Sequence, residues 1–117
     1  MITIGQMLDW VMEHRKGKVF KGYTRGEVAA ALQEGVESNT LWYVSAPCGK
    51  IVGMILFTKL TKPKVLFVIE NMAMSVKTLG VFAKRAKQEY PGWNIEGMRH
   101  DTHRKFNTSK LYRKLQA

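Results

Sequence analysis

The sequence lacks several features that would assign the chain to a class at once. It has one cysteine, Cys48, in 117 residues, which excludes an internal disulfide and favours a reducing, cytoplasmic compartment. Its longest apolar run covers residues 51–57, far short of the roughly 20 residues that a membrane-spanning helix needs. No signal peptide is visible at the start. We therefore expect a cytoplasmic protein that has no membrane partner.

Acidic residues are also scarce, above all in the second half of the chain. Residues 59–117 carry 13 of the 19 Lys and Arg residues and only 4 of the 9 Asp and Glu residues, so this half holds +9 of the net charge of +10. This skew suits a polyanionic partner, such as nucleic acid, an anionic surface or a phosphate-rich cofactor. It equally suits a solvated basic face that keeps the protein soluble. Charge alone leaves these alternatives open.

The sequence has no complete set of metal ligands. His100 and His103 are three residues apart beside Asp101, but no further Cys or His set completes a tetrahedral site. Cys48 sits in a turn with no histidine near it in the sequence, so we interpret it as incidental rather than as a nucleophile. We predict no metal, and we interpret the histidines as exposed loop residues.

The hydrophobic content of 45% and the length predict one folded domain that covers residues 1–117. Apolar residues at helical spacing predict two N-terminal helices, and each begins with a capping box, Thr3–Gln6 in the first and Thr24–Glu27 in the second. The helices are expected at about residues 3–14 and 24–36.

Strands dominate the middle of the chain. Residues 41–45 and 51–60 form a hairpin, and Gly53 inside it marks a bulge or a close backbone approach. Residues 65–72 are apolar on both faces, which predicts a central strand. The remaining elements are a helix at 76–90, a strand at 93–98, and a helix from Arg104 or Asn107 to Leu115. The order predicts a mixed α/β domain with helices covering a mainly antiparallel sheet.

This order, and two local patterns, resemble the GNAT acyltransferase superfamily over roughly residues 24–115. The turn at residues 49–53 (GKIVG) is similar to the family's turn into its third strand. Residues 107–115 resemble its last helix, with Asn107 and Tyr112 at or near the family's Asn and Tyr positions.

A third pattern follows the central strand. Family members have an apolar residue at the strand end, a Gln or Arg five positions later, and then x-x-Gly-x-Gly/Ala. Here Met72 takes the strand end, Lys77 the basic position, Gly80 the first glycine and Phe82 the last position. Phe82 departs from the small residue of the family, and a bulky side chain there is expected to crowd the cofactor.

The resemblance implies an acyl-CoA-dependent N-acyltransferase that uses acetyl-CoA, with an unknown acceptor. The backbones of Met72 and Met74 would pair with the pantetheine arm like an added strand. The N–H groups of the first helical turn would hold the pyrophosphate, with the Lys77 ammonium nearby, and Asn107 would belong to the same site. The N–H groups meant are those of Lys77, Thr78, Leu79, Gly80 and Val81. A simple strand–helix connection is the alternative interpretation.

The resemblance also implies two catalytic residues. Glu70 would be the general base, because partial burial beside apolar strands raises the pKa of a carboxyl group. Tyr112 would protonate the departing thiolate. The alternatives are a surface glutamate paired with a lysine and a half-buried helix aromatic. The methionines at 72, 74 and 98 are interpreted as core residues.

Two non-catalytic functions stay open. Residues 77–114, with aromatics at 90, 93, 106 and 112, could track a phosphate backbone and stack bases, although no nucleic-acid-binding motif supports this. The chain also lacks the last two strands usual in the family, so a sheet edge is expected that a second copy could cover as a homo-oligomer. A short domain with an altered cofactor turn resembles some bacteriophage proteins, including internal virion proteins. That comparison implies a role in virion assembly, and a location in the host cytoplasm or the virion.

Overall fold

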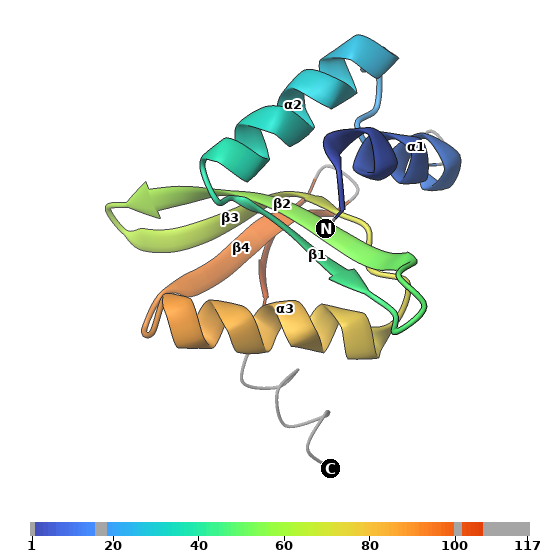
Figure 1. The fold of residues 1–117 in the computed structure, drawn as a ribbon. Coiled ribbons are helices and arrows are strands. Elements are labelled where there is room, and N and C mark those ends of the chain that lie inside the picture. The colour runs from blue at the N-terminus through green and yellow to red at the C-terminus, as the bar shows by residue number, and fades with distance from the viewer. Residues whose placement is uncertain (1, 16–18, 100–101, 107–117) are drawn as a thin grey trace.

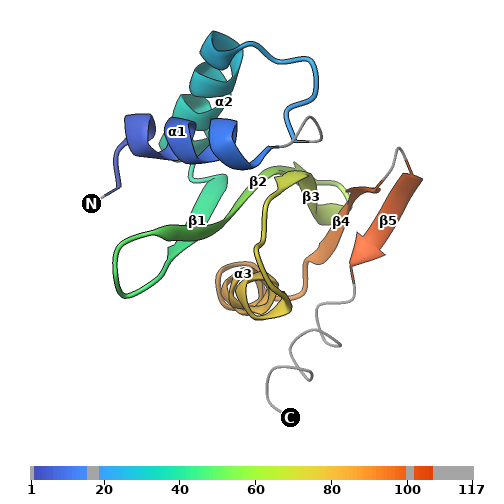
Figure 2. The ribbon, with the colours of Figure 1, turned by 90° about the vertical axis from the view of Figure 1, so that its right-hand side faces the viewer.

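A five-stranded mixed sheet lies between two helices on one face and one helix on the other. The computed structural model describes residues 2–15, 19–99 and 102–106, the last five as backbone only, as is the case for residues 98 and 99. The elements are α1 (Ile4–His14), α2 (Arg25–Glu37), β1 (Leu41–Ser45), β2 (Ile51–Thr61), β3 (Lys64–Asn71), α3 (Val76–Glu89), β4 (Asn94–Arg99) and β5 (Thr102–Phe106). Figures 1 and 2 show α1 and α2 together on one side of the sheet and α3 on the other.

The strands follow one another across the sheet in the order β1-β2-β3-β4-β5. The pairings β1–β2, β2–β3 and β4–β5 are antiparallel, and β3–β4 is parallel because α3 carries the chain back between these two strands. The prediction of a mixed α/β fold with a mainly antiparallel sheet is therefore confirmed. The prediction that the third strand is central is also confirmed.

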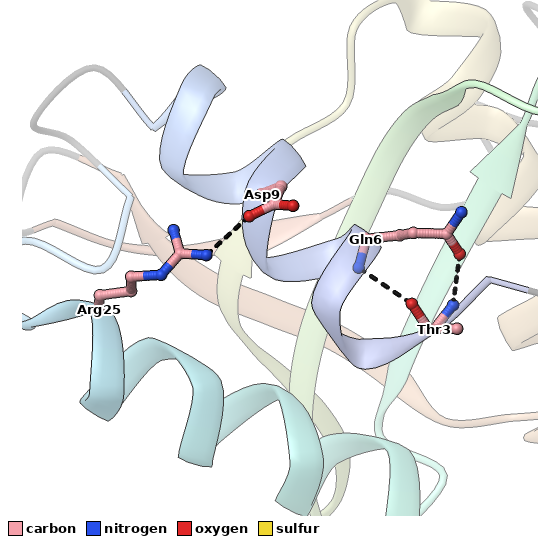
Figure 3. Close-up of polar contacts among 4 residues, drawn as sticks. All are labelled: Thr3, Gln6, Asp9 and Arg25. Atoms are coloured by element: carbon pink, nitrogen blue, oxygen red, sulfur yellow. Dashed lines mark hydrogen bonds and ion pairs between the residues drawn. The ribbon is translucent and has the colours of Figure 1, made fainter.

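The helices α1 and α2 are each capped at the N-terminus, and an ion pair on the surface links them. Thr3 and Gln6 form the capping box expected for α1, with bonds of 2.8 and 3.1 Å. Arg25, at the first position of α2, forms an exposed ion pair of 2.7 Å with Asp9 of α1 (Figure 3). The capping box at Thr24 is present as well. An exposed pair of this kind adds little stability, so the apolar stripes of both helices must supply most of their attachment.

Each face of the sheet has its own core. The face toward α1 and α2 buries Leu41, Met54, Leu56 and Met72 against residues such as Val11, Val28 and Leu32. The face toward α3 buries Trp42, Ile55, Phe57, Leu66 and Val68 against Phe82 and Ala86. Alternation along β1 and β2 sends neighbouring side chains to opposite cores.

The C-terminal part differs from the prediction. Residues 104–106 were expected to begin a helix but belong to β5, which pairs with β4 from Ile95–Phe106 to Arg99–Thr102. The sheet thus has a strand that the sequence pattern missed. Pairing with β5 gives hydrogen-bond partners to the outer edge of β4, and this tertiary demand overrides a weak local helical pattern. The rest of the expected helix, residues 107–115, lies outside the described residues.

Candidate functional site

The carboxyl end of β3 is the place where this sheet opens. Within the described residues, β3 and β4 pair from Val65–Asn94 to Val68–Gly97, whereas β3 continues to Asn71. From there the chain crosses to the N-terminus of α3 at Val76. Ligands of open α/β sheets bind outside the carboxyl ends of parallel strands, where neighbouring connections leave in different directions. The end of β3 is therefore the candidate site.

A β-bulge decides which way Glu70 points. The register of β2 and β3 shifts between Leu56–Glu70 and Phe57–Val68, so Ile69 is the extra residue. Ile69 and Glu70 both lie on the face that carries α1 and α2, Glu70 near Leu41 and Ile69 near Ala31. A regular strand would have sent one of them to the α3 face. The bulge thus brings Glu70 beside the segment that joins α1 to α2.

The Glu70 carboxyl group is partly buried at the end of β3. Burial raises the pKa of the Glu70 carboxyl group, and a hydrogen bond from the backbone N–H of Phe20 partly offsets this effect. Phe20 is itself buried and has a positive φ of 51°. Among the residues that the structure describes, Glu70 forms no ion pair with a lysine. The predicted rise in its pKa is confirmed.

Contrary to the prediction, the backbone groups of Met72 and Met74 face β2 and do not offer a ligand the expected pairing. Met72 exchanges two hydrogen bonds with Met54 of β2, at 2.8 and 3.3 Å, and the N–H of Met74 donates to Val52 at 3.1 Å. In an antiparallel pair, successive residues direct their backbone groups to opposite sides. The backbones of Asn71 and Ala73 therefore face away from β2. These two residues, and not Met72 and Met74, could pair with an added strand.

The side chains of the two methionines also differ from one another. Met72 is buried in the core under α1 and α2, as predicted. Met74 is 59% exposed, so its interpretation as a core residue is wrong. The side chain of Met98 lies outside the described part of the chain.

The first turn of α3 offers fewer N–H groups than expected. Ser75 caps the helix, and its hydroxyl accepts a hydrogen bond of 3.2 Å from the N–H of Thr78. The N–H of Leu79 donates to the carbonyl oxygen of Ser75 at 3.1 Å. The N–H groups of later residues, Gly80 and Val81 included, belong to the helical ladder. Only Val76 and Lys77 have N–H groups without a partner inside the helix, so the predicted span from Lys77 to Val81 is corrected to these two.

Phe82 does not stand over the helix N-terminus. Its side chain is 3% exposed and belongs to the core between α3 and the sheet. Gly80 and Thr78 are buried on the same helix, whereas Lys77 and Val81 are exposed. The crowding expected from Phe82 at the cofactor turn is therefore absent, because helical periodicity turns this residue toward the sheet.

Two features of the site have no signal in the sequence. Trp42 lines a small cavity under α3, and its buried Nε1 has no hydrogen-bond partner among the described residues. His14 lines a groove of about 460 Å³ between α1 and the start of β2, next to Met74. The Nδ1–H of His14 donates to the carbonyl oxygen of Trp10 at 2.8 Å, which fixes the orientation of the ring. Neither an empty pocket nor a fixed ring orientation can be read from residue order.

The remaining predicted residues add nothing to this site. Tyr112, Asn107, His100 and Asp101 lie outside the described residues. The interpretation of His103 as a loop residue is wrong, because His103 belongs to β5 and pairs with Met98 of β4. Cys48 is an exposed free thiol. The described ranges contain no group of three or more potential metal ligands. They also contain no helix that has both the length and the apolar character to cross a membrane.

Comparison with known proteins adds no relative. The chain matches no protein-family model, no curated protein and no solved structure.

Proposed function

We propose that this protein transfers an acyl group from acyl-CoA to an amine at the carboxyl end of β3. One observation carries the proposal: the unpaired end of β3 and the half-buried Glu70 carboxyl group are adjacent in the chain. The first offers backbone groups to an extended ligand, and the second offers a base. The GNAT superfamily, which the element order resembles, supplies the precedent for this combination.

The acyl-CoA would lie along the outer edge of β3. The N–H and carbonyl groups of Asn71 and the carbonyl of Ala73 would pair with the amide groups of the pantetheine arm. The N–H groups of Val76 and Lys77, with the Lys77 ammonium, would bind the pyrophosphate. When bound, acyl-CoA supplies a thioester whose carbonyl carbon an amine can attack.

Glu70 would prepare the acceptor. Its carboxylate accepts a proton from the ammonium form of the acceptor, which leaves the nitrogen lone pair free to bond to the acyl carbon as the carbon–sulfur bond breaks. A carboxyl group with a raised pKa is a stronger base than an ordinary carboxyl group. Tyr112 stays a predicted proton donor to the departing thiolate.

Isothermal titration with acetyl-CoA tests the binding step, and a matched pair of variants locates the site. Lys77→Glu should weaken binding about tenfold or more, because it replaces a cation next to the pyrophosphate by an anion. Lys84→Glu makes the same charge change further along α3, at another exposed position, and should bind nearly as the wild type does. Equal losses in both variants, or no heat at ~1 mM acetyl-CoA, where binding in the ~10 μM range would be evident, would overturn the proposal.

The base is tested separately by release of coenzyme A in the presence of a panel of primary amines. Glu70→Gln should bind acetyl-CoA as the wild type does and lose most of the transfer, since an amide cannot accept the proton. Transfer at the wild-type rate would remove Glu70 from the mechanism.

Nucleic-acid binding is a second candidate because α3 exposes Lys77, Lys84 and Lys87. Two aromatics proposed for base stacking, Tyr90 and Trp93, instead pack half-buried against the core under α3, with ring centroids 5.3 Å apart. This leaves a purely electrostatic interaction, whose affinity for a single-stranded oligonucleotide should fall steeply between 50 and 200 mM salt. A protein with an assembly role alone should bind neither acetyl-CoA nor the oligonucleotide.

A further inference from the structure

β1 forms one edge of the sheet, and its outer side has no partner among the described residues. The strand order places β1 next to β2 only. Figure 2 shows α1 and α2 above the sheet and α3 below it, with no described element beyond β1. An edge strand presents a row of backbone N–H and C=O groups with which a further strand can pair. β1 is therefore a surface on which an extended chain could bind.

The hydrogen bonds between β1 and β2 identify the backbone groups of β1 that are already used. The N–H of Phe57 donates to the carbonyl oxygen of Thr40, just before β1, at 2.9 Å. Bonded positions alternate along an antiparallel pair, so the next bonded positions on β1 are Trp42 and Val44. The backbone groups of these two residues therefore face β2.

The intervening residues of β1 direct their backbone groups outward. Tyr43 lies opposite Met54, whose N–H and carbonyl oxygen both bond to Met72 of β3. Tyr43 thus receives no backbone bond from β2. By the same alternation, the backbone groups of Leu41 and Ser45 also face the open edge. Three residues of β1 are therefore ready to pair with a further strand.

The sequence around β1 has no guard against such pairing. Natural edge strands commonly carry charged side chains or proline, which prevent the approach of another strand. Residues 38–49 contain no charged residue, although 24% of the chain is charged, and β1 itself has no proline. The strand at the other edge, β5, includes Arg104 and Lys105. The lack of charge at β1 favours its use as a contact surface.

A second copy of β1 fits this edge in the antiparallel direction. A two-fold axis at Tyr43 would place the outward backbone groups of the two Tyr43 residues opposite one another, and Leu41 opposite Ser45 of the second copy, so that all outward groups find partners. On the face toward α3, Trp42 would lie opposite Val44 of the second copy, and on the other face the two Tyr43 side chains would be neighbours. Aromatic pairs of both kinds stabilise antiparallel strands.

The charges at the two ends of β1 also favour this direction. Antiparallel pairing brings the end of α2, just before β1, near the β1–β2 turn of the second copy. Exposed Glu37 is the last residue of α2, and exposed Lys50 lies in that turn. Opposite charges therefore approach one another at both ends of the interface, because a two-fold axis repeats each contact. A parallel arrangement would instead bring like charges together.

We propose that β1 is a dimer interface, at which two copies of this chain pair antiparallel about Tyr43 and join their five-stranded sheets into one. Pairing of this kind closes after two copies, because each β1 edge is used once. The dimer does not depend on acyltransfer. β2 separates β1 from β3, so Glu70 and the end of β3 lie outside the interface.

Sedimentation equilibrium and hydrogen exchange test the interface on the unaltered chain. Because self-association follows mass action, the mass should rise from 13.4 kDa toward twice this value as the concentration rises to ~100 μM. Exchange of the Tyr43 backbone N–H, followed by nuclear magnetic resonance, should slow about tenfold over the same range, because only the dimer gives this group a partner. The Trp42 backbone N–H already faces β2, and its exchange should change much less.

A matched pair of cysteine variants tests the register. Both carry Cys48→Ser, which removes the one native thiol. Tyr43→Cys places two cysteines opposite each other at the axis, with Cα atoms about 5.5 Å apart, a separation that a disulfide spans. Ser45→Cys places them four residues apart along the strands, about 13 Å, which is too far. Under mild oxidation, most of Tyr43→Cys and little of Ser45→Cys should become a covalent dimer.

Three outcomes would overturn the proposal. The first is a mass that stays at 13.4 kDa up to ~100 μM. The second is a dimer in which the exchange of the Tyr43 N–H does not depend on concentration, or in which both cysteine variants cross-link equally, because its interface lies elsewhere. The third is a monomer in which a synthetic peptide of alternating threonine and valine slows this exchange, because the edge then binds a foreign strand. Should thermal melting show that Tyr43→Cys is unfolded, the exchange measurement on the unaltered chain decides.

Discussion

Gly53 of β2 and Thr78 of α3 are packed so closely that a Cβ atom on Gly53 would overlap the Cγ2 methyl of Thr78. The same Cβ atom would be in ordinary van der Waals contact with Ala73 Cα and the Met72 carbonyl oxygen, at 3.5 and 3.6 Å. The glycine therefore lets the first turn of α3 rest directly on β2. This contact fixes the helix N-terminus against the end of β3, where the candidate site lies.

Gly53→Ala should destabilise the protein by about 1–3 kcal/mol, as overpacking in a tight core does. Thr78→Ser removes the colliding methyl group, keeps the hydroxyl that lies 3.1 Å from the Ser75 hydroxyl, and should cost about 1 kcal/mol on its own. The double variant should be more stable than the sum of the two changes predicts. Urea unfolding of all four proteins measures the coupling, and strict additivity would mean that this contact is not tight.

Two glycines of α2 should respond in opposite ways to the same substitution. A Cβ on Gly35 would lie 2.8 Å from Leu41 Cβ and 2.9 Å from Leu56 Cδ1, whereas at Gly26 the nearest atom is 4.0 Å away. Gly26→Ala should leave the stability unchanged or raise it by up to ~1 kcal/mol through helix propensity. Gly35→Ala should lower it by about 1–3 kcal/mol in spite of the same propensity gain. Thermal unfolding of both variants is the measurement, and a stabilised Gly35→Ala would contradict the packing of α2 on the sheet.

The contribution of Glu70 to the stability of the folded protein should fall as the pH rises. Because burial raises its pKa in the folded state, the folded protein binds the proton more tightly than the unfolded chain does. Its favourable contribution is complete below the unfolded value of about 4.3 and is lost as pH rises through the folded value. Glu70→Gln should therefore gain stability relative to the wild type between pH 4 and 7, as followed by the melting temperature.

Glu27 provides the opposite case in the same experiment. Hydrogen bonds from the backbone and side chain of Thr24 lower the pKa of Glu27, so its contribution is present above the unfolded value and is lost as pH falls. Glu27→Gln should therefore be less stable than the wild type at pH 7, with a difference that shrinks toward pH 3. If the stability differences of Glu70→Gln and Glu27→Gln from the wild type changed in the same direction with pH, the opposite pKa shifts of the two carboxyl groups would be contradicted.

The side chain of Arg85 should contribute more to the stability of the protein than that of Glu89, its ion-pair partner. Its guanidinium stacks on Trp42 and also pairs with Glu89 one helical turn later. Glu89→Gln removes only the ion pair and should cost about 0.3–0.5 kcal/mol. Arg85→Gln removes the cation–π contact as well and should cost about 1 kcal/mol or more. Chemical unfolding compares the two, and equal losses would show that the stacking contributes nothing.

The first seven elements could be predicted from the sequence because each carries a strong local signal. The capping boxes at Thr3 and Thr24 mark where α1 and α2 begin, and both are present. The apolar runs of β2 and β3 and the turn with Gly49 at a φ of 91° define the middle of the sheet. β5 could not be predicted, since its strand state depends on pairing with β4 and not on its own pattern.

The sequence predicted where the candidate site lies in the fold, but not which atoms of the chain form it. The sequence indicated the β3–α3 connection and Glu70, and the structure locates both at the open end of the sheet. In the structure, the backbone groups that a ligand could pair with are those of Asn71 and Ala73, not those of Met72 and Met74. The side chain of Phe82 is buried in the core. A register shift of one residue is enough to move a side chain to the opposite face of the sheet.

Residue order alone therefore determined the helices, the main strands, the central place of β3 and the basic character of α3, because these follow from local propensity, apolar periodicity and composition. Only the tertiary structure decided the bulge that aims Glu70, the closeness of Gly53 and Thr78, and the orphan N–H of Trp42 beside a cavity. Each of these depends on contacts between segments far apart in the chain, which no local pattern of residues encodes.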